Sequence, residues 1–166
     1  MEQGTGNKDH GFRKLLAWQA ADDLASEVFR LTENEFNPRH RWLGHQIVRA
    51  AFSVTANIAE GYGRSSLGDY LRFLEFAGGS LNEVENALHF IRRNAICPHE
   101  SIAQAEQLRW KSGNLLFGLA RSLRSKLKNH EDWQRGLIKE QAGEYVTDAS
   151  NDMFQVPSSM FPDAEA

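Results

Sequence analysis

The stretch "NIAEGYGRSS", residues 57–66, decides how this chain folds, because it interrupts a sequence that otherwise has helical periodicity. The apolar residues before and after it recur every three or four positions, which keeps them on one face of a helix. Gly61 predicts the end of the first helix, since a residue without a Cβ readily adopts the left-handed conformation that often terminates helices. Ser66 predicts the start of the next, because its hydroxyl accepts a hydrogen bond from a free backbone N–H. The stretch therefore predicts a turn between two helices.

The same ten residues have the composition of a phosphate-binding loop, which is the alternative interpretation. Glycines followed by a helix N-terminus offer backbone N–H groups to an anion. Nucleotide-binding loops of this kind follow a β-strand, and a Walker loop has a lysine after its last glycine. Here a helix precedes the loop, and Arg64 follows Gly63. The structural interpretation is favoured, and an anion bound by Arg64 and the N–H groups of Ser65 and Ser66 stays open.

Hydrophobic periodicity predicts four long helices. Their expected bounds are 12–33, 39–60, 66–94 and 99–128. Four amphipathic helices with short connections predict an all-α fold, an up-down-up-down antiparallel four-helix bundle. Gly78, Gly79 and Ser80 interrupt the third helix, although an interior glycine costs about 1 kcal/mol relative to alanine. In the predicted hairpin they lie opposite Ala50 and Ala51, so we expect a close contact of the two backbones there.

The length and composition predict one domain with a hydrophobic core, since 41% of the 166 residues are hydrophobic. We expect a disordered N-terminus over 1–11, the bundle over 12–129, and an acidic, mostly irregular tail over 130–166. No stretch approaches the roughly 20 apolar residues of a membrane-spanning helix, so no membrane association is expected. The first residues lack the apolar run of a secretory signal, which predicts a cytoplasmic location.

Charge is distributed unevenly, although the net charge is only −3. Residues 12–130 carry 16 Lys and Arg against 12 Asp and Glu, whereas residues 131–166 carry 2 against 8. An acidic tail can shield a basic surface or compete for it. We interpret the tail as a mobile spacer, and docking on a partner or a neighbouring subunit is the alternative. That alternative rests on its hydrophobic residues, which are Met153, Phe154, Val156, Met160 and Phe161.

The sequence contains no recognisable catalytic or metal site. Its histidines have neither the HExxH spacing nor the Glu-x-x-His spacing of metal-binding helices, so we expect no cofactor. Cys97 precedes an expected helix start and has His99 nearby, an arrangement that can activate a thiol. We interpret Cys97 instead as a small apolar residue in a helix connection. The chain is therefore expected not to be an enzyme.

Polar residues on the second and third helices are expected to have structural roles. In the predicted hairpin, Arg49 lies near Glu83, and an ion pair between them would specify the register more than it would stabilise the fold. Asn57 and Glu60 are expected to hold the turn by bonding backbone groups or Arg64.

Basic residues gather near the ends of the third and fourth helices. Cations at helix C-termini interact favourably with the helix dipole, so no ligand is needed to explain them. A nucleic-acid contact is the alternative, although the charge of one chain is modest for binding phosphates, and several copies around a symmetry axis would multiply it. The residues concerned are Arg92, Arg93, Arg121, Arg124, Lys126 and Lys128.

The segment "QIVRAAFSVTANIAEGYGRSSLGDYLRFLEFAGGSLNEVENAL", residues 46–88, resembles the four-helix-bundle proteins encoded within intervening sequences of bacterial 23S ribosomal RNA genes. The family pattern is an Arg-Ala start, then Asn-Ile-Ala-Glu-Gly-x-Gly-Arg, an aromatic-rich stretch, and Gly-Ser-Leu-x-Glu-x-Glu. The resemblance extends from about Phe12 to Lys128. The residues that carry the pattern here are Arg49, Asn57, Glu60, Gly61, Gly63, Arg64, Gly79, Ser80, Glu83 and Glu85.

The resemblance implies a four-helix bundle that assembles as a ring-like homopentamer and has no known catalytic activity. A related group, the accessory variability determinants of diversity-generating retroelements, is similar in fold but basic, and binds a reverse transcriptase and nucleic acid. This chain departs from that group in its acidic tail and its modestly charged body. We therefore expect an oligomeric interaction scaffold whose partner includes other copies of itself. The alternative is a nucleic-acid-binding accessory factor that works with a protein such as a reverse transcriptase.

Overall fold

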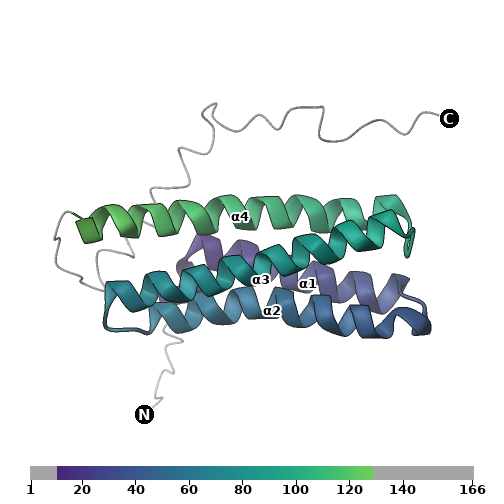
Figure 1. The fold of residues 1–166 in the computed structure, drawn as a ribbon, viewed down its shortest axis with the longest axis horizontal. Helices are drawn as coiled ribbons and strands as arrows, with labels where there is room; N and C mark the ends of the chain where they lie inside the picture. Colours follow the sequence, from purple (N-terminus) through teal and green to yellow (C-terminus); the bar gives the residue numbers. More distant parts are fainter. Residues whose placement is uncertain (1–10, 129–166) are drawn as a thin grey trace, which may run out of the picture.

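The computed structural model describes residues 11–128, which form a bundle of four long helices with no β-strand among them. Figure 1 shows the helices running alongside one another in alternating directions, and each packs against the next while α1 packs against α4. The predicted all-α, up-down-up-down bundle is confirmed. The predictions for residues 1–10 and 130–166 concern residues outside the described range. The elements are η1 (Gly11–Lys14), α1 (Leu16–Glu35), η2 (Pro38–His40), α2 (Arg41–Tyr62), α3 (Leu67–Arg93) and α4 (His99–Lys128).

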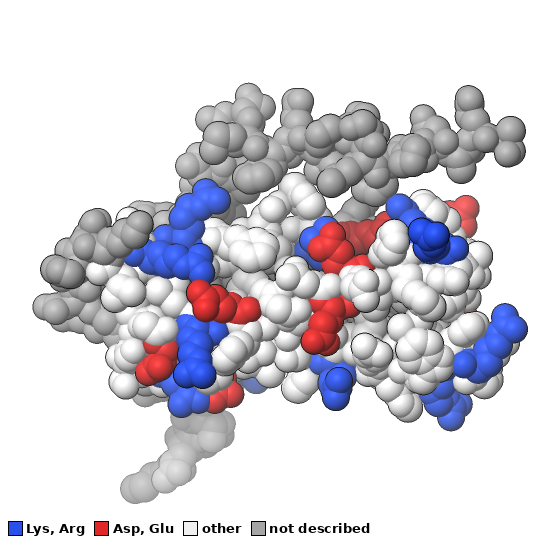
Figure 2. All heavy atoms as spheres, in the orientation of Figure 1, with Lys and Arg blue, Asp and Glu red and all other residues white. Residues whose placement is uncertain are grey.

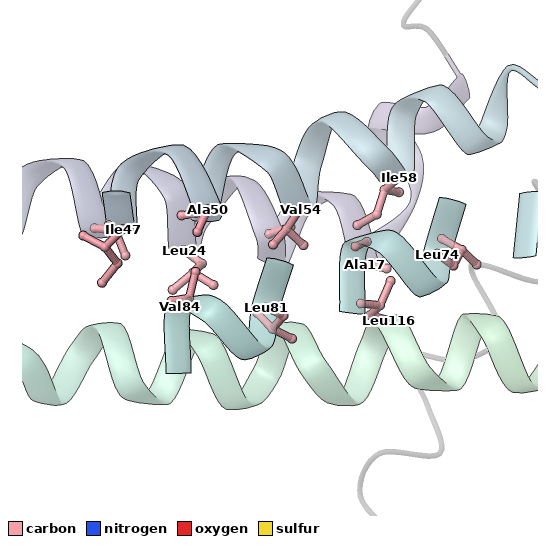
Figure 3. Close-up of a cluster of buried hydrophobic side chains, with 14 of the residues drawn as sticks. Ala17, Leu24, Ile47, Ala50, Val54, Ile58, Leu74, Leu81, Val84 and Leu116 are labelled. Carbon is pink, nitrogen blue, oxygen red and sulfur yellow. The ribbon is translucent and has the colours of Figure 1, made fainter. Parts of the chain in front are cut away.

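The core fills the space between the four helices with aliphatic side chains, as the predicted periodicity requires. In Figure 3 each helix contributes side chains that point into this space, and their burial supplies the main free energy of folding. The labelled residues are Ala17, Leu24, Ile47, Ala50, Val54, Ile58, Leu74, Leu81, Val84 and Leu116.

The turn between α2 and α3 lies where the sequence places it, but Gly61 does not end α2. The helix continues to Tyr62, and no glycine among residues 11–128 has a positive φ. Gly63 forms the C-cap in a right-handed conformation, with φ −75°, and its N–H donates to the Glu60 carbonyl at 3.0 Å. The predicted helix start is confirmed, because Ser66 Oγ accepts a hydrogen bond from the Asp69 N–H at 3.1 Å.

Gly61 is explained instead by the close approach of α3. A Cβ at this position would lie 2.6 Å from Cδ2 of Tyr70 and 2.8 Å from Cβ of Phe73, well inside contact distance. Tyr70 is fully buried, which raises the pKa of its phenol above the usual value, and its ring packs edge-on against Tyr62. The prediction located the turn correctly but gave the wrong reason for Gly61.

The glycines in the middle of α3 do not mark the expected close contact with α2. A Cβ at Gly78 would lie an ordinary 3.6 Å from the Phe117 ring of α4, and a Cβ at Gly79 would meet no atom within 4 Å. Ser80 does reach α2, because its hydroxyl lies 3.0 Å from Ser53 Oγ. The third helix is therefore joined to the second by a pair of serines, while Gly79 leaves bare backbone on the surface.

Three kinds of feature were sought within residues 11–128: a reactive cysteine, a metal site and a membrane-spanning helix. Cys97 is buried in the core cluster, and burial raises the pKa of its thiol, which fits the interpretation of Cys97 as a packing residue. No group of His, Cys, Asp and Glu within residues 11–128 has the arrangement of a metal site. None of the helices in this part of the chain has an apolar run long enough to cross a membrane.

Candidate functional site

Most of the residues that carry the family pattern lie on one surface, the outer side of α2 and α3. We call it the α2–α3 face. Its residues are exposed or half-buried and recur at helical spacing on each helix, and the contact between Ser53 and Ser80 joins the two rows. They are Arg49, Phe52, Ser53, Ala56, Asn57 and Glu60 on α2, and Phe73, Phe76, Gly79, Ser80 and Glu83 on α3.

The α2–α3 face has an apolar middle that sequence analysis did not single out. Phe52 and Phe76 are 65% and 47% exposed, and the bare backbone of Gly79 lies in the same row of α3 as Phe76. Large apolar side chains that stay exposed in one region of a surface are typical of interaction sites. A signal for Phe52 was available in the sequence, because it falls outside the apolar stripe that runs from Leu43 to Ile58.

Two opposite charges on this face, Arg49 and Glu83, form no ion pair with any residue in the described range 11–128. The predicted pair between Arg49 and Glu83 is absent, because neither residue takes part in the ion pairs found in residues 11–128. Both residues are exposed on the outer sides of their helices, where water solvates them separately. The prediction of an internal pair was wrong, and the α2–α3 face presents a cation on α2 and an anion on α3.

Near the turn between α2 and α3, the polar residues of the face interact with other residues of the same chain. The carboxylate of Glu60 forms an ion pair with Arg64, as predicted, and the Arg64 guanidinium lies over the Phe73 ring at 4.5 Å from its centroid. Asn57 does not bond the turn, since its amide donates to the Ser53 carbonyl one helical turn earlier, at 2.8 Å. Because Arg64 already has a carboxylate partner, the geometry disfavours the alternative of an anion bound at this turn.

Glu85 and Glu75 lie on the other side of α3 and connect it to α4. Glu85 forms an ion pair with Arg109 at 3.1 Å, and Glu75 forms one with Arg124 at 2.9 Å. Glu85 is therefore a pattern residue that lies outside the α2–α3 face, and its role in this structure is to join two helices.

The basic residues considered for nucleic-acid contact do not form one surface. Because α3 and α4 are antiparallel, Arg92 and Arg93 lie at one end of the bundle, whereas the basic end of α4 lies at the other (Figure 1). Arg92 is paired with Glu106 at 2.9 Å, and Arg124 with Glu75. In Figure 2 acidic and basic side chains alternate down the left of the view, which lowers the net potential there.

The remaining basic residues are near the end of α4. Arg121 is exposed and Lys126 half-buried, and neither takes part in an ion pair within residues 11–128. Lys128 is the last residue of α4.

The chain is similar to a known protein family and to a solved structure. The model of the family described as 23S rRNA-intervening sequence protein matches residues 13–118. The chain is also similar to the crystal structure, at 1.70 Å, of a protein with unknown function from the S23 ribosomal protein family of Bacteroides thetaiotaomicron VPI-5482. The two are 21% identical, with a TM-score of 0.55, over 63% of this chain and 98% of that chain, a likeness that concerns the fold. No protein of curated function matched. The chain belongs to the 23S rRNA-intervening sequence protein family.

Proposed function

We propose that this chain is a non-enzymatic scaffold that assembles with copies of itself through the α2–α3 face. The observation that carries the proposal is the exposed apolar middle of this face, around Phe52 and Phe76, together with the unpaired charges of Arg49 and Glu83. Burying an exposed phenylalanine contributes about 1.5–3 kcal/mol, whereas an exposed ion pair contributes less than about 1 kcal/mol. Apolar burial therefore supplies the affinity, and the charges supply the orientation.

The placement of the charges is compatible with a ring as well as with a two-fold dimer. The cation lies on the α2 side of the face and the anion on the α3 side, so the α2 side of one copy complements the α3 side of the next. A head-to-tail contact of this kind closes into a ring when its rotation closes. The number of subunits, five, comes from the family resemblance rather than from the geometry. A cytoplasmic location for the ring remains a prediction from the sequence.

Cys97, the cysteine of the chain, does not have the properties of a catalytic nucleophile. Catalytic cysteines are exposed thiolates with a lowered pKa, whereas Cys97 is buried and its pKa is raised. The described residues also offer no cluster that would bind a metal. Residues 11–128 present the exposed apolar and charged side chains of the α2–α3 face, and such a surface suits a scaffold.

Reversal of the two charges tests the proposed contact. Arg49→Glu should weaken self-association about 5- to 30-fold, since it places two carboxylates opposite each other in the contact, and Arg49→Glu with Glu83→Arg should recover most of the loss. Sedimentation velocity over a range of chain concentrations measures the change. Arg93→Glu is the matched control, because Arg93 is exposed at the end of α3 and outside the face. A double reversal weaker than either single reversal would contradict the pairing across the contact.

A nucleic-acid accessory role is the second candidate, and one observation favours it. From residue 107 to residue 128, α4 carries six basic residues and no acidic one. This candidate predicts that structured RNA is bound at low salt and that binding falls steeply at higher salt, because bound phosphates release their counterions. Arg121→Ser should weaken binding in a mobility-shift assay, whereas Arg93→Ser, at the opposite end, should not. Failure to shift the RNA at low salt would remove the candidate.

A further inference from the structure

The outer side of α4 carries a second exposed apolar surface, away from the α2–α3 face. Trp110 and Phe117 are 44% and 53% exposed, and their spacing of seven residues places them on the same side of the helix. Asn114 lies between them and Arg121 follows one turn later. We call these four residues the α4 stripe.

The α4 stripe has a positive charge at its C-terminal end. Of the basic residues in this half of α4, Arg109 is paired with Glu85, Lys111 with Asp23 at 3.9 Å, and Arg124 with Glu75. Arg121 is exposed and pairs with no carboxylate within residues 11–128. Figure 2 shows the basic side chains gathered over the C-terminal part of α4, with uncharged surface beside them. The stripe therefore suits a ligand that is both apolar and acidic.

The chain contains a segment of that composition. Residues 140–166 carry six Asp and Glu and no Lys or Arg, and they include the five hydrophobic residues noted above. Eleven residues, 129–139, separate this segment from the end of α4. Residues 129–139 span up to about 36 Å when extended, whereas Lys128 and Trp110 are about 27 Å apart along α4. The segment is long enough to fold back over the stripe, and tethering gives it a high effective concentration there.

We propose that residues 140–166 bind the α4 stripe of their own chain. Hydrophobic side chains such as Phe154 cover Trp110 and Phe117, and the carboxylates lie near Arg121. The contact does not depend on the proposed self-association, because it uses the outer side of α4 rather than the α2–α3 face. A direct consequence is that the segment competes with any polyanion for the basic end of α4.

Photo-crosslinking of the full-length chain tests the proposal. Phe154 is replaced by p-benzoylphenylalanine, and the cross-linked peptides are identified by mass spectrometry. We expect the cross-links to fall within residues 107–124, and to connect residues of one chain when unlabelled and ¹⁵N-labelled chains are mixed. Cross-links concentrated on α1 or α2, or between chains of different isotope composition, would overturn the proposal.

Two variants and a matched control make the test specific. Phe117→Ser should lower the yield of these cross-links at least about fivefold, because it removes one of the two aromatic rings of the contact. Arg121→Glu, a surface change that leaves the packing of the helices intact, should lower it as well. Phe52→Ser removes an exposed phenylalanine from the α2–α3 face instead, and it should leave the yield unchanged. Equal yields in all four chains would also overturn the proposal.

Discussion

Gly61→Val should destabilise the bundle by about 3 kcal/mol or more, at the upper end of the cost of overpacking a core. The new Cβ would lie 2.6 Å from a ring carbon of Tyr70 and 2.8 Å from the Cβ of Phe73. Neither atom is the end of a flexible side chain, and the Tyr70 ring is fully buried, so the start of α3 has to move away from α2. Chemical denaturation followed by circular dichroism, at one fixed chain concentration, measures the loss.

Gly118→Ala is the matched control for this prediction. Gly118 lies inside α4, and a Cβ there would meet no atom within 4 Å. Alanine is the better helix former, so the variant should gain up to about 1 kcal/mol. A Gly61→Val chain within about 0.5 kcal/mol of the unchanged protein would refute the packing explanation of Gly61.

Phe52→Ser combined with Phe76→Ser should dissociate the assembly while leaving each bundle folded. Both side chains are exposed in the single chain, so their loss costs the core little, whereas each contact between subunits loses two buried phenylalanines. Full burial of an exposed ring contributes about 1.5–3 kcal/mol, and these rings are 65% and 47% exposed, so the dissociation constant of a contact should rise roughly 20- to 300-fold. Sedimentation equilibrium measures this change, and circular dichroism checks that the helices persist.

Phe117→Ser is the control for the assembly experiment. It exchanges roles with Phe52→Ser, which is the control for binding of residues 140–166 to the α4 stripe. Phe117 is as exposed as the two replaced residues but lies on α4. We expect the Phe117→Ser chain to sediment like the unchanged protein. If the double variant on the α2–α3 face kept its full mass, another surface would have to hold the subunits together.

The fold was predictable because its determinants are local. The apolar stripe of each helix and the Ser66 cap can be found from neighbouring residues alone, and the structure has these helices within a few residues of the predicted bounds. The reason for Gly61 was not local, since it depends on the rings that α3 brings up against α2. Gly61, Tyr70 and Phe73 can be found in the sequence, but their distances depend on how α2 and α3 pack.

The candidate site was only partly predictable for the same reason. The pattern residues were assigned to α2, α3 and the turn between them, where the structure has them, but the direction of each side chain decides whether neighbours pair. Arg49 and Glu83 were expected to pair and do not, whereas Glu60 and Arg64, one turn apart, do. Arg92 and Arg124 were grouped by charge, although antiparallel helices place them at opposite ends of the bundle.

The central claim is that the α2–α3 face joins copies of this chain, and the mass of the full-length protein in solution tests it most directly. Multi-angle light scattering at micromolar concentration should give about 94 kDa, five times the 18.8 kDa of one chain. A mass of 18.8 kDa that does not change as the concentration is raised would contradict the account.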